Sequence, residues 1–218
     1  MNNPEEQKQP NTNEIITPLK NEDHFNEVVH IIDDSSKKLS LQTIPLTEYE
    51  KLDKIPIEEV KKIGIRNKFL CSKSIPVEKF DADLHSLLDN MRITLYLQQG
   101  VGLAAPQIGK NKRIFLALIN DKVVEFINPE IIYKEGTQKV VEACLSIPNY
   151  AGFLERPLTI TVKAYDRNRK EFTLTLTGDD AKCICHEYDH LDGILYVEYV
   201  DRLVNVNDYL KYLKTQEQ

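Results

Sequence analysis

His186 and His190 stand four residues apart, with Glu187 directly after the first, in the segment HEYDH. Residues four apart project from one face of a helix, so both imidazoles can reach a single metal ion if this segment is helical. Glu187 would lie about 100 degrees around the same helix. From there its carboxylate can approach a metal-bound water molecule without being a ligand. This spacing predicts a metal-dependent hydrolase, but it does not tell which one.

A catalytic metal site of this type needs a third protein ligand and an open position for water. The chain has no histidine after His190, so a cysteine is the better candidate. Cys183 lies one turn before His186 on the same helix face, whereas Cys144 would have to arrive from a separate strand. Spacing alone leaves both candidates open. The four cysteines follow no spacing typical of secreted disulfide frameworks, so we expect free thiols that can bind a metal.

The periodicity of apolar side chains predicts the elements that must position these residues. Residues 80–97 have a mostly helical rhythm, and residues 181–190 form a second predicted helix behind Gly178, Asp179 and Asp180. Strand-like runs lie between the two helices, at residues 113–119, 123–127, 139–141, 158–164 and 171–177. We therefore predict an α+β fold, with antiparallel and mixed β-strands packed around a central helix that carries the HExxH motif.

Charge and hydropathy narrow the class of function. The net charge is −6, but residues 1–60 carry 13 acidic and 6 basic side chains, which leaves about +1 on the remaining residues. The chain has no basic stripe, so we infer no direct nucleic-acid binding. No apolar run is long enough to span a membrane, and the first residues do not resemble a signal peptide. We therefore expect a cytoplasmic protein without a membrane contact.

The composition divides the chain into three parts. Residues 1–60 form an acidic N-terminal extension, which we expect to be partly disordered because it has too few large apolar side chains to offset the entropy of ordering. Residues 61–203 form the predicted catalytic domain. Residues 204–218 form a short C-terminal helix or tail.

Three short segments resemble, in order and spacing, the three motifs of the peptide deformylases. They are residues 100–107 (GVGLAAPQ), 142–146 (EACLS) and 185–190 (CHEYDH). The resemblance runs from about residue 61 to residue 201. A single glycine-rich segment would be weak evidence, but three independent motifs in one order are specific.

The resemblance implies that Cys144, His186 and His190 bind one divalent metal ion. It implies ferrous iron as the native metal, which zinc, nickel or cobalt can replace, although one thiolate with two imidazoles would by ligand softness alone suggest zinc. Cys183 would then line the substrate pocket instead of binding the metal.

The resemblance also implies a mechanism. Metal coordination lowers the pKa of bound water and gives a hydroxide that attacks the formyl carbon, while Glu187 accepts the proton and passes it to the departing amine. The side-chain amide of Gln107 and the backbone N–H of Leu145 would stabilise the negative formyl oxygen. Val101 and Gly102 would contact the substrate, with no Cβ at Gly102 to keep the loop away from it. The products would be formate and a peptide with a free N-terminal methionine.

The implied partners are N-formylated nascent peptides, together with a transient association with the ribosome. Glu142 would support the metal ligands from behind, paired with Arg156. Asp179 and Asp180 stand where many relatives have two leucines, one of them near the pocket for the methionine side chain. We expect Asp179 to cap the following helix through a hydrogen bond from a backbone N–H, rather than to make the rim of that pocket polar.

Two other functions are compatible with the same residues. A hydrolase of another acylated amine or of a short peptide would have the same metal ligands and a different pocket. A binding module could keep the fold without turnover, but a purely structural metal site would not need Glu187 as a general base.

Overall fold

The computed structural model describes residues 68–200 and 202–207. Its elements, in chain order, are α3 (Ala82–Leu97), β1 (Gly102–Ala104), the 3-10 helix η3 (Ala105–Ile108), β2 (Ile114–Ile119), β3 (Lys122–Glu135), β4 (Gln138–Cys144), β5 (Ile147–Arg156), β6 (Thr159–Tyr165), β7 (Glu171–Thr177), α4 (Asp179–Leu191), the 3-10 helix η4 (Tyr196–Glu198) and β8 (Arg202–Asn205). The prediction of an acidic extension over residues 1–60 lies outside the described residues.

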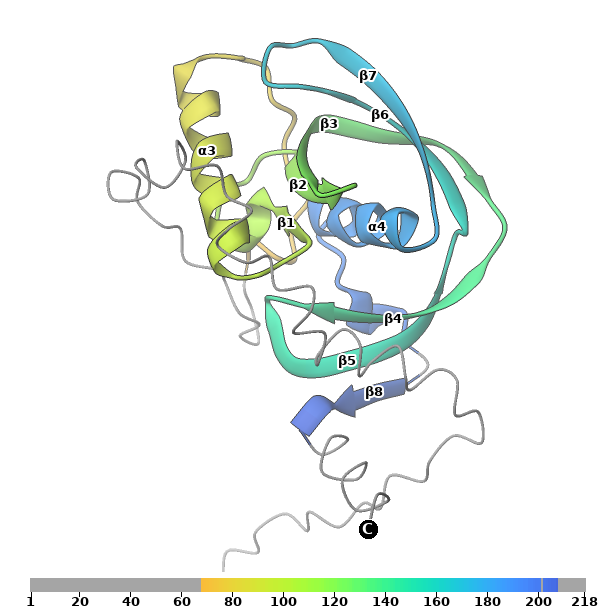
Figure 1. Ribbon diagram of the computed structural model, residues 1–218. Helices are drawn as coiled ribbons and strands as arrows, with labels where there is room; N and C mark the ends of the chain where they lie inside the picture. The colour runs from red at the N-terminus through yellow and green to blue at the C-terminus, as the bar shows by residue number, and fades with distance from the viewer. Residues whose placement is uncertain (1–67, 201, 208–218) are drawn as a thin grey trace, which may run out of the picture.

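The described strands form two antiparallel sheets, so the chain is an α+β protein. One sheet has the order β1-β2-β3-β6-β7 and the other the order β4-β5-β8. Every ladder between these strands is antiparallel, and the only parallel pairing in the described part of the chain is an isolated bridge between Ile75 and Lys112. The expectation of mixed sheets was therefore wrong. Helix α4 packs against β1, β2, β7 and η3, and in Figure 1 it lies between the strands of the two sheets.

Helix α3 begins later than its apolar rhythm predicted. Asp81 has an extended backbone, and its side chain accepts a hydrogen bond from the N–H of Leu84 at 3.1 Å, so the helix starts at Ala82. The apolar face of the helix packs into a core cluster with β1, η3 and β2, and it contributes Leu84, Leu87, Leu88, Met91 and Leu95. This packing anchors the loop that leads into β1.

Helix α4 begins at a glycine and not at a capping aspartate. Gly178 occupies the N-cap position with φ +64, and no side chain makes a capping hydrogen bond there. Asp179 is the first residue inside the helix, and its carboxylate pairs with Lys182 at 2.6 Å. The prediction that Asp179 caps the helix by hydrogen bonding was therefore wrong, because the left-handed backbone of Gly178 already makes the turn into the helix.

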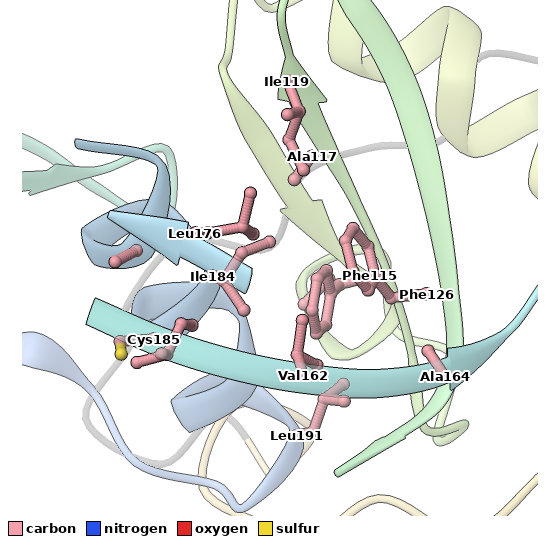
Figure 2. Close-up of a cluster of buried hydrophobic side chains, with 13 residues drawn as sticks. Phe115, Ala117, Ile119, Phe126, Val162, Ala164, Leu176, Ile184, Cys185 and Leu191 are labelled. Carbon is pink, nitrogen blue, oxygen red and sulfur yellow. The ribbon is translucent and has the colours of Figure 1, made fainter. Parts of the chain in front are cut away.

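One side of α4 is part of the hydrophobic core. Ile184, Cys185 and Leu191 pack with apolar residues of β2, β3, β6 and β7. Figure 2 shows this cluster, in which the rings of Phe115 and Phe126 stack with centroids 4.6 Å apart. Because this side of the helix is anchored in apolar packing, its other side can hold polar groups at fixed positions.

The strands differ from the prediction mainly in extent. The runs in β2, β6 and β7 were predicted within two residues, while β3 and β4 are longer than predicted at both ends. Three strands were not predicted: β1, β5 and β8. Strand β5 contains Pro148 and Gly152, which interrupt a strand pattern in sequence. Strand β8 crosses residue 203, so a domain boundary there would divide a strand. The division into domains stays a prediction.

Within the described residues, none of the helices has both the length and the apolar character that crossing a membrane would require.

Candidate metal centre

Two elements bring a cysteine and two histidines together. Cys144 is the last residue of β4, at a point where the ladder with β5 shifts register, and His186 and His190 lie on α4. Their potential ligand atoms all lie within 4.8 Å of one another. Cys144 Sγ is 3.3 Å from His190 Nε2, and the two imidazole centroids are 4.9 Å apart. Cys183, which spacing alone left open as a ligand, is not part of this group.

The ring of His186 is oriented by a carboxylate on β4. His186 Nδ1 lies 2.8 Å from Glu142 Oε2. An ionised carboxylate only accepts hydrogen bonds, so Nδ1 must carry a proton, and Nε2 is the nitrogen left to bind a metal. Arg156 holds Glu142 in turn with two hydrogen bonds, from Nε to Oε1 at 2.7 Å and from Nη2 to Oε2 at 3.0 Å. The pairing of Glu142 with Arg156 that the sequence predicted is present.

Asp189 is a member of this network that the sequence analysis missed. Its Oδ2 accepts a hydrogen bond from Arg156 Nη1 at 2.6 Å. Asp189 lies between the two motif histidines, three residues after His186. Residues three apart are neighbours on the surface of a helix, and this spacing from His186 was the signal that could have revealed Asp189.

The second carboxylate beside the cluster has a different environment. Glu187 is 4% exposed, and its Oε2 is buried without a hydrogen-bond partner among the described residues. Burial raises the pKa of Glu187 to about 7, although the nearby His186 opposes this shift. A carboxyl group with this pKa can exchange a proton near neutral pH.

In the absence of a metal ion, the pKa of His186 is raised and the pKa of His190 is lowered. Burial alone lowers the pKa of His186, but hydrogen bonds with Cys144 and Glu142 outweigh burial and raise it. Burial and the neighbouring His186 lower the pKa of His190 well below its ordinary value. A metal ion must therefore displace a proton from His186, so we expect metal affinity to rise with pH.

Gln107 directs its amide nitrogen toward the cluster. Its Oε1 accepts a hydrogen bond from the N–H of Ala104 at 2.7 Å. This bond leaves Nε2 to donate, at 3.3 Å to Ser146 Oγ and at 3.6 Å to Cys144 Sγ. The sequence analysis missed both Ala104 as an anchor for the amide and Ser146 as its neighbour.

The remaining predicted site residues lie around the same cluster. Val101 is 60% exposed in the bend before β1, and its carbonyl oxygen lies 3.6 Å from Cys183 Sγ. Leu145 follows Cys144 in the turn between β4 and β5, and its side chain packs on the core cluster that includes α3. Gly102, in β1, lies against Glu187.

The chemistry of this donor set fits a divalent metal ion. One sulfur and two imidazole nitrogens make a three-ligand site of the kind that leaves an open position for water. The buried Glu187 Oε2 lacks a partner, and a buried polar atom of this kind requires an explanation. A water molecule between a metal ion and this carboxylate would supply the missing hydrogen bond.

Comparisons with known proteins agree with this geometry. Residues 59–206 match the family model described as polypeptide deformylase. The chain is 49% identical over 139 residues to a peptide deformylase of Caldicellulosiruptor bescii, an alignment that covers 64% of this chain and 84% of that protein. It is 44% identical over 139 residues to peptide deformylase 2 of Clostridium acetobutylicum, covering 63% of this chain and 93% of that protein.

Solved structures show the same relationship. The peptide deformylase of Thermotoga maritima has a TM-score of 0.65 and 33% identity, and the match covers 67% of this chain and 99% of that one. The peptide deformylase of Synechococcus elongatus in complex with actinonin has a TM-score of 0.65 and 33% identity, with 72% and 86% covered. The chain is thus an enzyme that belongs to the polypeptide deformylase family, whose members remove N-formyl groups from nascent peptides.

Proposed function

We propose that this enzyme removes the formyl group from the N-terminal formyl-methionine of nascent polypeptides and releases formate. The observation that carries the proposal is the cluster of Cys144, His186 and His190, with the carboxylate of Glu187 beside it, whose Oε2 has no hydrogen-bond partner among the described residues. The proposed reaction is that of the family. Three of these side chains would be the metal ligands that it requires, and Glu187 would be the proton-transfer group.

Cys144, His186 and His190 would hold one divalent metal ion, with ferrous iron as the native metal and zinc, nickel or cobalt as replacements. A bound ion of this kind supplies a Lewis acid and lowers the pKa of a coordinated water molecule. Glu142 and Arg156 keep the imidazole of His186 in the tautomer that can bind a metal, which is their role in the proposal.

Glu187 moves the protons. Its carboxylate accepts a proton from the attacking water molecule as the new carbon–oxygen bond forms. It then delivers the proton to the amine nitrogen as the bond between that nitrogen and the formyl carbon breaks. In the chain without a metal ion, burial raises the pKa of this carboxyl group to about 7, so its surroundings favour the protonated form that the second step uses.

Gln107 and Leu145 stabilise the charge that develops on the formyl oxygen. The hydrogen bond from Ala104 fixes which end of the Gln107 amide carries the donors, and this supports a donor role for Nε2. The backbone N–H of Leu145, directly after Cys144, would supply the second donor. Two such donors prepared in advance need no reorganisation during the reaction.

Val101, Gly102 and Cys183 would line the path of the substrate, because the bend before β1 and the first half of α4 meet at the contact between Val101 and Cys183. The substrates of this reaction are nascent chains, so the proposal includes a cytoplasmic location and a transient association with the ribosome.

The test is formate release from a formyl-methionyl peptide by protein purified without oxygen and analysed for metal. The same peptide with an acetyl group or a free amine serves as the control. We expect formate from the formylated peptide and no cleavage of the acetylated one. Equal or faster release of acetate would instead assign the enzyme to another acylated amine.

The metal ligands are tested by a matched pair of cysteine variants. We expect Cys144→Ala to lose both the metal and the activity, because two imidazoles alone bind a divalent ion weakly. Cys183→Ala should keep both. Loss of metal from Cys183→Ala, with metal retained by Cys144→Ala, would reverse the assignment.

A further inference from the structure

The side chain of Glu187 fills the space in which a side chain at position 102 would begin. A Cβ atom built on Gly102 would lie 2.3 Å from Oε1, 2.7 Å from Cδ and 2.8 Å from Cγ of Glu187. Real Cβ atoms essentially never lie within 3.0 Å of such neighbours. Any residue other than glycine would therefore push the carboxylate away or push β1 and α4 apart.

This requirement for glycine comes from the neighbour and not from the backbone. Gly102 is not among the described glycines with positive φ, and it pairs with Ala117 in the ladder between β1 and β2. An alanine can adopt such a strand conformation without strain. Contact with Glu187 is thus the reason the structure gives for a glycine here.

Nearby Gly100 provides a contrast. A Cβ at Gly100 would meet Leu145 Cδ1 and Leu95 Cδ1, each at 3.0 Å, and the backbone oxygen of Gly102 at 3.3 Å. The two closest atoms are the ends of flexible apolar side chains, which can move by a few tenths of an ångström. The group that faces Gly102 is instead the buried carboxylate of Glu187, a residue of α4, and α4 packs directly against β1.

We propose that Gly102 is a positioning residue for Glu187: its missing Cβ leaves a slot in β1 that fixes the position of the carboxylate. This inference rests on the role of Glu187 in the proposed function. With Cγ, Cδ and Oε1 packed on Gly102, the side chain cannot change its rotamer freely, and Oε2 has no partner in the part of the chain that the structure describes.

Strand β1 thereby sets the relative positions of two groups of the site. Gly102 holds the carboxylate through van der Waals contact, and two residues later the N–H of Ala104 holds the amide of Gln107. One short strand therefore spaces the proton-transfer group from the proposed donor to the formyl oxygen. An error of about 1 Å in such a spacing can reduce a rate on the order of a hundredfold.

The test is a double-mutant cycle between Gly102→Ala and Glu187→Ala. Gly102→Ala should lower kcat on the order of tenfold to hundredfold, with an unchanged metal content and a much smaller change in KM. Glu187→Ala removes the Cγ, Cδ and Oε1 atoms that the new Cβ would meet. Gly102→Ala should therefore have little further effect on kcat in the Glu187→Ala background, and the double variant should be about tenfold or more faster than the product of the two single effects predicts.

Gly100→Ala combined with Glu187→Ala is the matched control, and its two effects should multiply. The melting temperature gives a second reading if Gly102→Ala destabilises the fold. Relief of the contact predicts that Glu187→Ala raises the melting temperature of Gly102→Ala more than that of Gly100→Ala.

Multiplicative effects in the Gly102 cycle, with no recovery of the melting temperature, would overturn the role of Gly102 and leave that of Glu187 intact. Failure of the proposed function would look different: Glu187→Gln would keep normal formate release, and this result would overturn both.

Discussion

Glu142 and Glu187 are identical side chains with the same exposed fraction, 4%, and both lie beside His186. Burial raises the pKa of each one. For Glu142 the hydrogen bonds from His186 and Arg156 outweigh burial, and its pKa falls from 4.5 to about 2. Within residues 68–200 and 202–207 no such hydrogen bond reaches Glu187 Oε2, and the pKa of Glu187 rises from 4.5 to about 7. Burial is thus equal in the two cases, and the partners decide the charge.

The difference assigns the two carboxylates to different tasks. A group that stays ionised at all working pH values can orient a metal ligand but cannot carry a proton back and forth. A group that titrates near neutrality can do so. Pairs of titratable groups whose surroundings push their pKa values apart are typical of acid–base sites. Here the two carboxylates with different pKa values both lie beside the imidazole of His186.

The largest expected effect is on Glu187 itself. Glu187→Gln keeps the shape of the side chain but removes its ability to accept a proton, so kcat should fall on the order of a hundredfold to ten-thousandfold. Metal content, measured by atomic absorption, should stay close to that of the wild type. Turnover within a few fold of wild type would mean that Glu187 does not move the protons, and the contrast with Glu142 would lose its functional meaning.

The second expected effect is an acid-dependent loss of stability from Glu142. Its pKa is lower in the folded chain than in the unfolded chain, so its contribution is complete above about pH 4.5 and is lost as the pH falls toward 2. For metal-free protein we expect the free energy of unfolding to fall by roughly 3 kcal/mol more in the wild type than in Glu142→Gln over this range. Urea unfolding at several pH values measures this difference, and parallel curves would contradict it.

The third effect concerns metal affinity. Glu142→Gln weakens the acceptor for His186 Nδ1–H, and loss of such a supporting group typically costs about tenfold to a hundredfold in metal affinity. At saturating metal, kcat should recover to within a few fold of wild type, because Glu142 does not contact the reacting atoms in the proposed mechanism. Competition with a chelator measures the affinity.

Glu125 offers a matched control for this measurement. It is also buried and paired with arginines, accepting hydrogen bonds from Arg92 and Arg167, but it lies on β3 and outside the metal cluster. Glu125→Gln should leave metal affinity unchanged. Equal losses in both variants would show that general destabilisation, and not the orientation of His186, weakens the site.

The sequence predicted the motif-based part of the site better than the part made by packing. Residues that are close in sequence within one motif keep similar relative positions wherever that motif occurs. The motif around Cys144 and the motif around His186 are both of this kind. The pairing of Glu142 with Arg156 was implied by the resemblance, because each of the two residues stands in a segment that matches the family. The contact between Gly102 and Glu187 was not predicted, because it depends on how closely β1 approaches α4, which only the tertiary structure determines.

The same division holds for the fold. Strands β2, β6 and β7 alternate or carry continuous apolar runs that are visible in sequence, and they were found. Strand β1 has three residues, which are too few for a recognisable alternation of polar and apolar side chains. Strand β8 is recognised as a strand from its pairing with β5. Edge and short strands depend on their neighbours for their stability, so their own residues predict them poorly.

The smallest expected effect extends the comparison to a carboxylate that is not buried. The side chain of Asp179 is 86% exposed and pairs with Lys182, while it lies in the first turn of α4. Its contribution should come from its charge near the positive end of the helix, about 0.3–1 kcal/mol, because exposed ion pairs add little. Asp179→Ala and Asp179→Asn should therefore lower the free energy of unfolding by similar amounts. A capping hydrogen bond would give another result, since asparagine caps helices as well as aspartate does and only the alanine variant would lose stability.

Because the carboxylate of Asp179 faces solvent, Asp179→Leu should also leave substrate preference unchanged. The measurement is the ratio of the activity toward formyl-methionyl peptides to the activity toward formylated peptides with a polar first residue. A clear rise in that ratio would show that position 179 contacts the first side chain of the substrate.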